Sequence, residues 1–258
     1  MKIINWNVNS INSRIDHLVD LLKKEDPDIV LLQEIKCEES GFPYLMLSDF
    51  SYEIAISGQK SYNGVAIFSK YKIQSVKKHF PNNPLVDHAR FIEIECETDL
   101  GMTKIVSLYA PNGGEVGSEK FVQKFAFYKE FNQYLNQFHN QKENIIIGGD
   151  FNIAPFDIDV YNAKNLQNST GFTLDEKQIL RKIFNEGFCD LYRLKNPFSK
   201  EFSWWDYREG GFEQNKGMRI DFIISNIEIA YHLKEAKLLK EYRSRIKPSD
   251  HIPLMIEL

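Results

Sequence analysis

The chain has 258 residues, of which 43% are hydrophobic and 26% are charged, a balance typical of globular proteins that excludes the disordered class. Its 32 basic and 36 acidic side chains give a net charge of −4, which permits a polyanionic partner without indicating one. Layered folds of this length commonly form one unit, so we expect residues 1–258 to be a single domain.

Apolar, β-branched segments of strand length recur along the whole chain. In the first half they span residues 2–8, 28–34, 52–57, 64–69, 89–95 and 103–109. In the second half they span residues 144–150, 202–207, 218–225, 227–233 and 251–258. Most are bounded by turn residues, so the sequence predicts a strand-rich protein.

Helical periodicity appears between some of these strands. A first helix is expected behind Ser13 as its N-cap, with Pro27 marking its far end. A second fits residues 122–138, and a third fits residues 174–185 behind the cap candidate Thr173. Many short strands with a few interspersed helices predict an α/β protein, in which two packed sheets carry helices on the outside.

The cysteines and the start of the chain bear on where the protein works. Cys37, Cys96 and Cys189 are odd in number and include no CxxC pair, so neither a disulfide framework nor a thiolate zinc site is predicted. The first residues already form a predicted strand, and no apolar run approaches the roughly 18 residues that a membrane span needs. We therefore expect a cytoplasmic protein without a signal peptide or a membrane anchor.

Several apolar strands end in acids or amides that local structure does not require. Glu34 follows one such run, and Asp150 and Asn152 follow another. A carboxylate at the mouth of a buried strand costs desolvation free energy unless an ion or hydrogen bonds satisfy it. A single acid of this kind is more often a turn or cap residue, but several strand ends together favour a functional site.

Oxygen-bearing side chains of this kind predict a site for a hard divalent cation. Mg²⁺ prefers oxygen ligands and keeps several waters, so one or two carboxylates and an amide suffice. Glu34 is the candidate principal ligand, with Asn7 and Asp250 as neighbours. Alternation puts Asn5, Asn7 and Asn9 on one strand face, and for Asn5 and Asn9 a polar strand edge or a turn is the preferred interpretation.

A carboxylate and an imidazole stand near the C-terminus. Asp221 interrupts an apolar strand, and Asp250 and His251 immediately precede the last strand. Pairing with a carboxylate fixes an imidazole and favours its protonated form, which can stabilise charge developing on a phosphate. An Asp-His dipeptide before a strand is common in loops. Asp250 and His251 therefore indicate a functional site only in combination with the polar residues at the other strand ends.

Seven short motifs occur in a fixed order: WNVN at 6–9, LQE at 32–34, YAPNG at 109–113, GGDFN at 148–152, FSWWDYR at 202–208, RID at 219–221 and SDH at 249–251. The ordered set closely resembles the exonuclease III family of apurinic/apyrimidinic (AP) endonucleases, within the endonuclease/exonuclease/phosphatase superfamily. The resemblance implies a four-layered α/β sandwich of the DNase I-like kind. Two facing mixed β-sheets would be flanked by helices, with the site at one end.

The resemblance also implies a metal site. Glu34 would hold Mg²⁺, for which Mn²⁺ is an expected substitute, with help from Asn7 and Asp250. Asp150 and Asp250 fit either a one-metal or a two-metal arrangement. The candidate ligands are therefore Asn7, Glu34, Asp150, Asn152, Asp250 and His251.

Catalytic roles follow from the same resemblance. Asp150 and Asn152 would position and activate the attacking water. His251, oriented by Asp221, would contact the scissile phosphate, while Tyr109 would help to stabilise the phosphate or the leaving group. In-line attack builds charge on the nonbridging and departing oxygens, which a metal, an imidazolium and a phenol can each offset.

Substrate choice depends on other residues, because the superfamily shares this core chemistry. The segment FSWWDYR and the following KGMRID resemble the abasic-site pocket of the repair enzymes. Trp204, Met218 and Ile220 would form an apolar recess for a flipped, base-less sugar. The alternative is that Trp204 and Trp205 are core aromatics, an interpretation that fits Trp205 at least equally well. The candidate phosphate contacts are Lys36, Arg90, Asn112 and Arg208.

The resemblance thus implies an AP endonuclease that cuts 5′ to an abasic site, with 3′→5′ exonuclease and 3′-end trimming activity. Its partner would be double-stranded DNA with abasic sites or blocked 3′ ends, bound by a monomer. A superfamily phosphodiesterase acting on a lipid or inositol phosphate is the first alternative and would need a different insertion at residues 202–208. A noncatalytic nucleic-acid-binding relative is the second, and it would be expected to lack some of the ligands.

Overall fold

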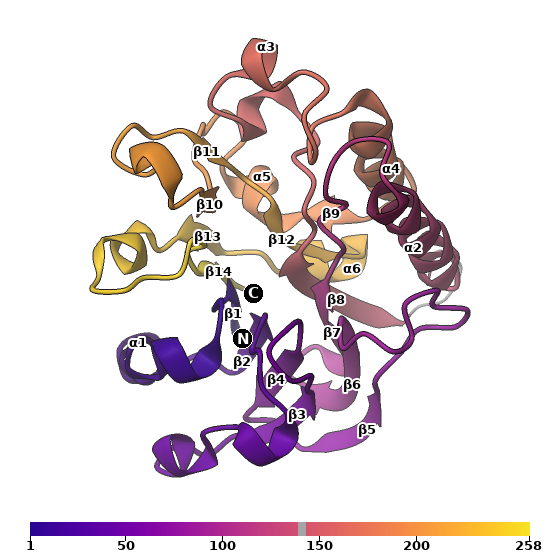
Figure 1. Cartoon of the computed structure of the whole chain (residues 1–258). Helices are drawn as coiled ribbons and strands as arrows, with labels where there is room; N and C mark the ends of the chain where they lie inside the picture. Colours follow the sequence, from indigo (N-terminus) through magenta and orange to yellow (C-terminus); the bar gives the residue numbers. More distant parts are fainter. Residues whose placement is uncertain (139–142) are drawn as a thin grey trace.

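Two six-stranded β-sheets pack face to face in the computed structural model, which describes residues 1–138 and 143–258 (Figure 1). The first sheet has, in spatial order, β13 (Glu235–Leu238), β14 (Leu254–Glu257), β1 (Lys2–Asn7), β2 (Ile29–Gln33), β4 (Val65–Ser69) and β3 (Glu53–Ser57). The second has β5 (Ile73–Lys77), β6 (Phe91–Thr98), β7 (Gly101–Tyr109), β8 (Asn144–Asp150), β12 (Asp221–Ser225) and β9 (Cys189–Asp190). Because β1 and β2 are parallel, as are β7 and β8, while the other pairs are antiparallel, both sheets are mixed.

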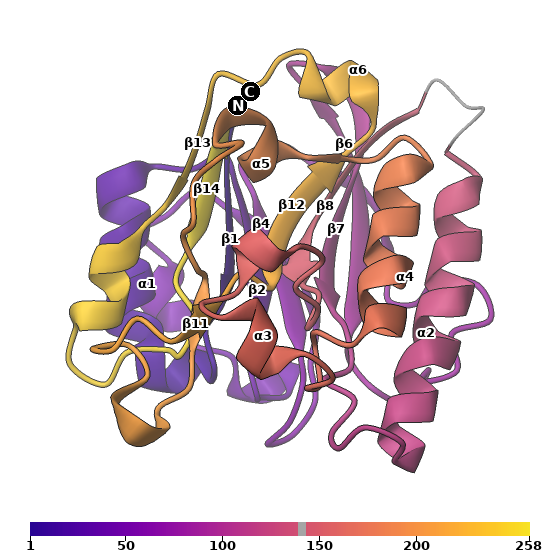
Figure 2. The same ribbon diagram turned by 90° about the horizontal axis from the view of Figure 1, so that it is seen from above.

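Helices cover the outer faces of both sheets, which gives the four layers that the resemblance implied (Figure 2). Helix α1 (Ile11–Glu25) packs on the outside of the first sheet, and α2 (Glu119–Asn136) and α4 (Leu174–Asn185) pack on the outside of the second. The shorter elements are α3 (Ala163–Leu166), α5 (Leu191–Lys195), α6 (Ile227–Ala230) and a ribbon of β10 (Trp204–Trp205) with β11 (Gly217–Met218). Within the described ranges, none of these helices has the length and apolar character needed to cross a bilayer.

Strand alternation decides which layer each apolar side chain enters. On β1, Ile3 packs between the two sheets, whereas Ile4 and Trp6 pack toward α1. The sheets approach closely where β8 carries two glycines, since a Cβ on Gly148 would lie 2.3 Å from Leu31 Cδ1. This close approach holds the end of β8 against the ends of β1 and β2.

A short chain of buried polar side chains links the two sheets below this end. Asn5 Nδ2 donates to the carbonyl of Gly149 at 3.4 Å, and Gln33 Nε2 donates to Asn5 Oδ1 and to Ser107 Oγ, both at 2.9 Å. Asn5 has no exposed surface, so its interpretation as a polar strand edge is wrong. Its Nδ2 is satisfied by the opposite sheet and its Oδ1 by Gln33 of the neighbouring strand, instead of by solvent.

The helix predictions are confirmed with shifted boundaries. Helix α4 has the predicted bounds and the predicted N-cap, Thr173, which forms a capping box with Glu176. Helix α1 begins earlier than predicted, with Ser10 instead of Ser13 at the N-cap position, and α2 begins at Glu119 behind Ser118. Most of the predicted strands are likewise present and somewhat shorter.

The predicted strand at residues 227–233 is wrong. Its first residues form α6, and the strand lies further on, at β13. This segment connects β12 of the second sheet to β13 of the first, so it cannot extend either sheet. The predicted strand at 218–225 is likewise divided around Arg219 and Ile220, where the chain leaves the β10–β11 ribbon for the second sheet.

Candidate active site

The site lies at the end of the sandwich where the central strands of both sheets terminate. Strand pairing places Asp221 opposite Asp150, and Asp150 beside Tyr109, within the second sheet. Asn7 ends β1 in the first sheet and Glu34 follows β2. A cavity of about 280 Å³ opens here, lined by Glu34, Tyr109, Asn112, Asp150, Asn152, Thr170, Gly171, Trp204, Met218, Ile220, Asp250 and His251.

Asn7 joins the two carboxylates that come from different sheets. Its Nδ2 donates to Glu34 Oε1 at 2.8 Å and to Asp150 Oδ2 at 3.0 Å. Ligand atoms of Glu34, Asp150 and His251 all lie within 4.8 Å of one another. Carboxylate oxygens are donors that a hard divalent cation prefers, so Glu34 and Asp150 fit a metal site, while the Asn7 oxygen accepts from the backbone N–H of Asn9.

His251 is held between two buried carboxylates. Its Nδ1 lies 2.8 Å from Asp221 Oδ2, and its Nε2 lies 3.7 Å from Asp150 Oδ2. Burial alone would lower the pKa of His251, but Asp221 and Asp150 outweigh it and raise that pKa to about 10. Burial raises the pKa of Asp150 above its usual range, although His251 opposes the shift. The imidazole is therefore a cation at neutral pH.

Ser203 holds the same oxygen of Asp221 that faces His251. Its Oγ donates to Asp221 Oδ2 at 2.5 Å and accepts the backbone N–H groups of Ile220 and Asp221. The hydroxyl thereby locks the carboxylate that orients His251. Ser203 was not among the predicted residues, and the only signal for it was its position in the motif FSWWDYR.

Asn152 follows β8 in a left-handed backbone conformation, with φ 51°. Its backbone N–H donates to Asp150 Oδ1 at 2.9 Å, and its Nδ2 donates to the carbonyl of Ala110 at 2.9 Å. Asn112 Nδ2 donates to Asn152 Oδ1 at 3.1 Å. These bonds fix both amides at the cavity wall.

Tyr109 lines the same cavity from the end of β7. The guanidinium of Arg90 lies over its ring, 4.6 Å from the centroid. Burial, followed by the charges of Glu34 and Asp150, raises the pKa of Tyr109 well above its ordinary value. The phenol therefore remains a hydrogen-bond donor at neutral pH.

The three predicted pocket residues form one wall of the cavity. Trp204 pairs with Met218 in the β10–β11 ribbon, and Met218 and Ile220 are buried in an apolar cluster with Phe172. Trp204 is half-buried, and its Nε1 donates to Asp250 Oδ2 at 3.0 Å. The apolar wall is thus tied to one of the candidate ligands.

Asn9 belongs to the site as well as to a turn. Its Nδ2 donates to Asp250 Oδ1 at 2.9 Å, and its Oδ1 accepts from Lys36 Nζ at 2.5 Å. Lys36 also pairs with Glu34 Oε2 at 2.8 Å. The sequence interpretation set Asn9 aside, although its spacing of two residues from Asn7 was a signal for it.

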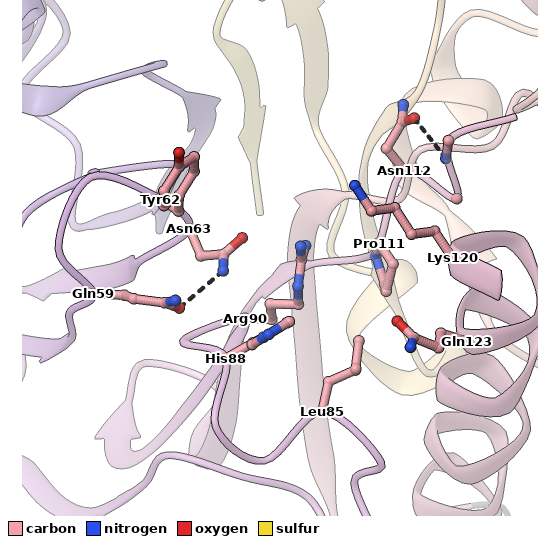
Figure 3. Close-up of a pocket in the computed structure, with 12 residues that line it drawn as sticks. Gln59, Tyr62, Asn63, Leu85, His88, Arg90, Pro111, Asn112, Lys120 and Gln123 are labelled. Atoms are coloured by element: carbon pink, nitrogen blue, oxygen red, sulfur yellow. Dashed lines mark hydrogen bonds between the residues drawn. The ribbon is translucent and has the colours of Figure 1, made fainter. Parts of the chain in front are cut away.

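Two of the predicted phosphate contacts lie in a neighbouring depression of about 390 Å³ (Figure 3). Figure 3 shows Tyr62 on one side, Asn112 and Lys120 on the other, and His88 and Arg90 between them. Asn112 lines both hollows and so connects this depression to the cavity.

Arg208 lies apart from both hollows just described. Its guanidinium is exposed and pairs with Asp206 at 2.6 Å. It lines a third depression, which shares Trp204 and Met218 with the cavity. The structure therefore places this residue beyond the apolar wall.

Comparison with known proteins gives consistent results. The pattern of the Endonuclease/Exonuclease/phosphatase family matches residues 4–251. The exodeoxyribonuclease III of Haemophilus influenzae is 33% identical over all of this chain and 99% of its own length.

Two solved structures are similar over 100% of this chain and 99% of their own. A 3′-5′ exonuclease from Neisseria meningitidis superposes with a TM-score of 0.94 at 32% identity. An AP endonuclease from Archaeoglobus fulgidus superposes with a TM-score of 0.94 at 31% identity. These likenesses confirm the DNase I-like fold and the resemblance drawn from the motifs. The chain therefore belongs to the exonuclease III family of AP endonucleases, within the endonuclease/exonuclease/phosphatase family.

Proposed function

We propose that this chain is a DNA repair nuclease that cleaves the phosphodiester bond 5′ to an abasic site, with 3′→5′ exonuclease and 3′-end trimming at the same site. The proposal rests on one observation, which is that two features line the same cavity. One is the cluster of Glu34, Asp150 and His251, and the other is the apolar wall of Met218 and Ile220. Such a wall suits a sugar without its base, and the cluster suits the adjoining phosphate.

The carboxylate oxygens of Glu34 and Asp150 would hold Mg²⁺, or Mn²⁺ as a substitute. Asn7 would join them as a ligand once its amide turns, since its Nδ2 faces both carboxylates and its Oδ1 accepts from the backbone N–H of Asn9. The bound ion would offset charge that builds on the phosphate oxygens. His251 is protonated and so offers an N–H to a phosphate oxygen instead of a ligand lone pair. Asp250 is occupied by hydrogen bonds at the cavity margin and would act as an outer ligand.

Asp150 and Asn152 would position and activate the attacking water. A carboxylate whose pKa is raised by burial is a better proton acceptor near neutral pH than an ordinary one. The Asn152 amide, fixed through Ala110 and Asn112, would orient that water. Tyr109 remains protonated and would donate to a phosphate or leaving-group oxygen.

The flanking strand of double-stranded DNA, carrying an abasic site or a blocked 3′ end, would follow the depression of Figure 3. Arg90 and Lys120 supply positive charge there, and Asn112 supplies an amide at its junction with the cavity. Lys36 and Arg208 would contact phosphates once released from Glu34 and Asp206.

We also propose one catalytic domain over residues 1–258, acting as a monomer in the cytoplasm. The two sheets share a single buried cluster, which supports one folding unit. All three cysteines are free thiols, which suits a reducing compartment.

The test is a duplex with one tetrahydrofuran abasic analogue, incubated with the purified protein in Mg²⁺ and in chelator. We expect a metal-dependent nick 5′ to the analogue, which Glu34→Ala should abolish and Lys182→Met, on the outer helix α4, should leave unchanged. Inositol polyphosphates and sphingomyelin serve as rival substrates. Absence of the nick, or equal nicking by Glu34→Ala, would refute the proposal.

A further inference from the structure

Lys124 on α2 and Glu176 on α4 form an ion pair with no exposed side-chain surface, 2.5 Å between Nζ and Oε1. The pair lies behind the cavity wall, and neither residue lines the cavity. We propose that Lys124 and Glu176 are positioning residues, which hold the backbone of Asn112, Asn152 and Gly171 in the geometry that cleavage needs. This inference rests on the proposed nuclease function.

Lys124 satisfies three acceptors with one ammonium group. Its Nζ donates to the carbonyls of Asn112 at 3.1 Å and Asn152 at 2.8 Å, as well as to Glu176. An ammonium has three N–H donors, so all of them are used. The loops that follow β7 and β8 are thereby held at a fixed separation.

Glu176 extends the same network to a third loop. Both of its carboxylate oxygens accept from the backbone N–H of Gly171 at 2.9 Å, and Oε2 accepts from Thr173 Oγ1 at 2.7 Å. The carbonyl of Gly171 in turn accepts from the N–H of Ala154 at 2.8 Å. Gly171 lines the cavity, so the carboxylate fixes part of its wall.

The local conformation explains why this support matters. Asn152 has a left-handed backbone with φ 51°, a region that is uncommon for residues other than glycine although asparagine adopts it more readily than most. Its side chain bonds to Asn112, and its backbone N–H bonds to Asp150. A shift of either carbonyl that Lys124 holds would therefore displace the amide pair and the carboxylate at the cavity.

Stability alone gives little reason for such a pair. Replacing a buried ion pair by packed apolar side chains is often neutral or stabilising, whereas removing one partner is strongly destabilising. The ammonium, unlike an apolar side chain, can bind the carbonyls of Asn112 and Asn152. This difference separates a positioning role from a purely structural one.

The experiment compares the double variant Lys124→Met/Glu176→Leu with a control double variant, Lys182→Met/Glu186→Leu, which removes an ion pair at the C-terminal end of α4. We expect the first to unfold within a few degrees of the parent but to lose at least tenfold in kcat, with KM changed less than threefold. The control should keep the parental kcat. A folded Lys124→Met/Glu176→Leu protein with parental kcat would overturn the proposal.

If that double variant does not fold, two further measurements test the positioning role. Glu176→Gln keeps the shape of the side chain and one acceptor oxygen for Lys124, so the contact is weakened instead of removed, and we expect a folded protein with reduced kcat; parental kcat would overturn the proposal. Side-chain amide NMR signals of Asn112 and Asn152 should shift in Glu176→Gln and not in the control, and unshifted signals would overturn it as well. If the parent itself does not nick abasic DNA, the proposed function fails, while these NMR signals still test the positioning role.

Discussion

Replacing Asp221 by asparagine tests whether His251 acts as a cation. The carboxylate has no exposed surface, and its Oδ2 lies 2.8 Å from His251 Nδ1 and accepts from Ser203 Oγ as well. Asparagine keeps the shape and one acceptor oxygen, so the ring should remain in place. What is lost is the negative charge that raises the pKa of the imidazole.

The expected loss follows from the kind of bond removed. A hydrogen bond to a charged group contributes roughly 1.5–3 kcal/mol. If that stabilisation is expressed in the transition state, Asp221→Asn should lower kcat by about 10- to 150-fold. Because the pKa of His251 also falls, the decline in rate with rising pH should begin at lower pH in the variant.

Single-turnover nicking of the abasic duplex across a pH series measures both effects. A double-mutant cycle with His251→Asn adds a second criterion, because residues that act as one unit give a double variant no worse than the poorer single variant. Glu93→Gln is the matched control, since Glu93 is a buried carboxylate that accepts from Tyr134 away from the cavity. Activity of Asp221→Asn within threefold of the parent, or additive losses in the cycle, would refute the assigned role.

Three further changes have defined outcomes. The free energy of unfolding of the metal-free protein should fall as pH rises from 6.5 to about 10, by up to about 1.4 kcal/mol per pH unit. The reason is that folded His251 keeps its proton in this range, whereas the unfolded chain loses it. Denaturant titrations should show a shallower fall in His251→Asn. Gly149→Ala should cost roughly 3 kcal/mol in the same titrations, because its Cβ would lie 2.3 Å from the Leu108 carbonyl oxygen, whereas Gly41→Ala should cost little. Met218→Ala should lower the ratio of nicking at abasic to intact sites by about tenfold, since one wall of the recess is removed.

The parts of the site that the sequence predicts are those with a local signal. Glu34 and Asp150 each lie just beyond an apolar run, and Asp221 interrupts one, so their desolvation cost is visible without the structure. Thr173 and Glu176 have the spacing of a capping box, which is why the bounds of α4 are predicted correctly. The roles of Asn152 and Tyr109 come from the family resemblance, since amides and phenols at strand ends are common.

The parts that the sequence does not predict depend on contacts between distant segments. Lys124 is one lysine on an amphipathic helix, where solvent exposure is the ordinary outcome, and its partner Glu176 is 52 residues away. Residues 227–233 have strand-like alternation, but topology requires a crossing between sheets there. Such positions become visible only when the packing of whole elements is known.

Strand β1 shows how one alternating pattern acquires three different roles. Asn5, Asn7 and Asn9 share a face by spacing, yet the strand ends at Asn7, so the three side chains meet different surroundings. Asn5 bonds to the opposite sheet, Asn7 bonds to Glu34 and Asp150, and Asn9 bonds to Asp250 and Lys36 at the margin. Periodicity fixes the direction of a side chain, but its distance from the end of the strand decides whether it can reach a ligand. Asn5 therefore links the two sheets, whereas Asn7, two residues later, is a candidate ligand. Local propensity does not distinguish these two roles.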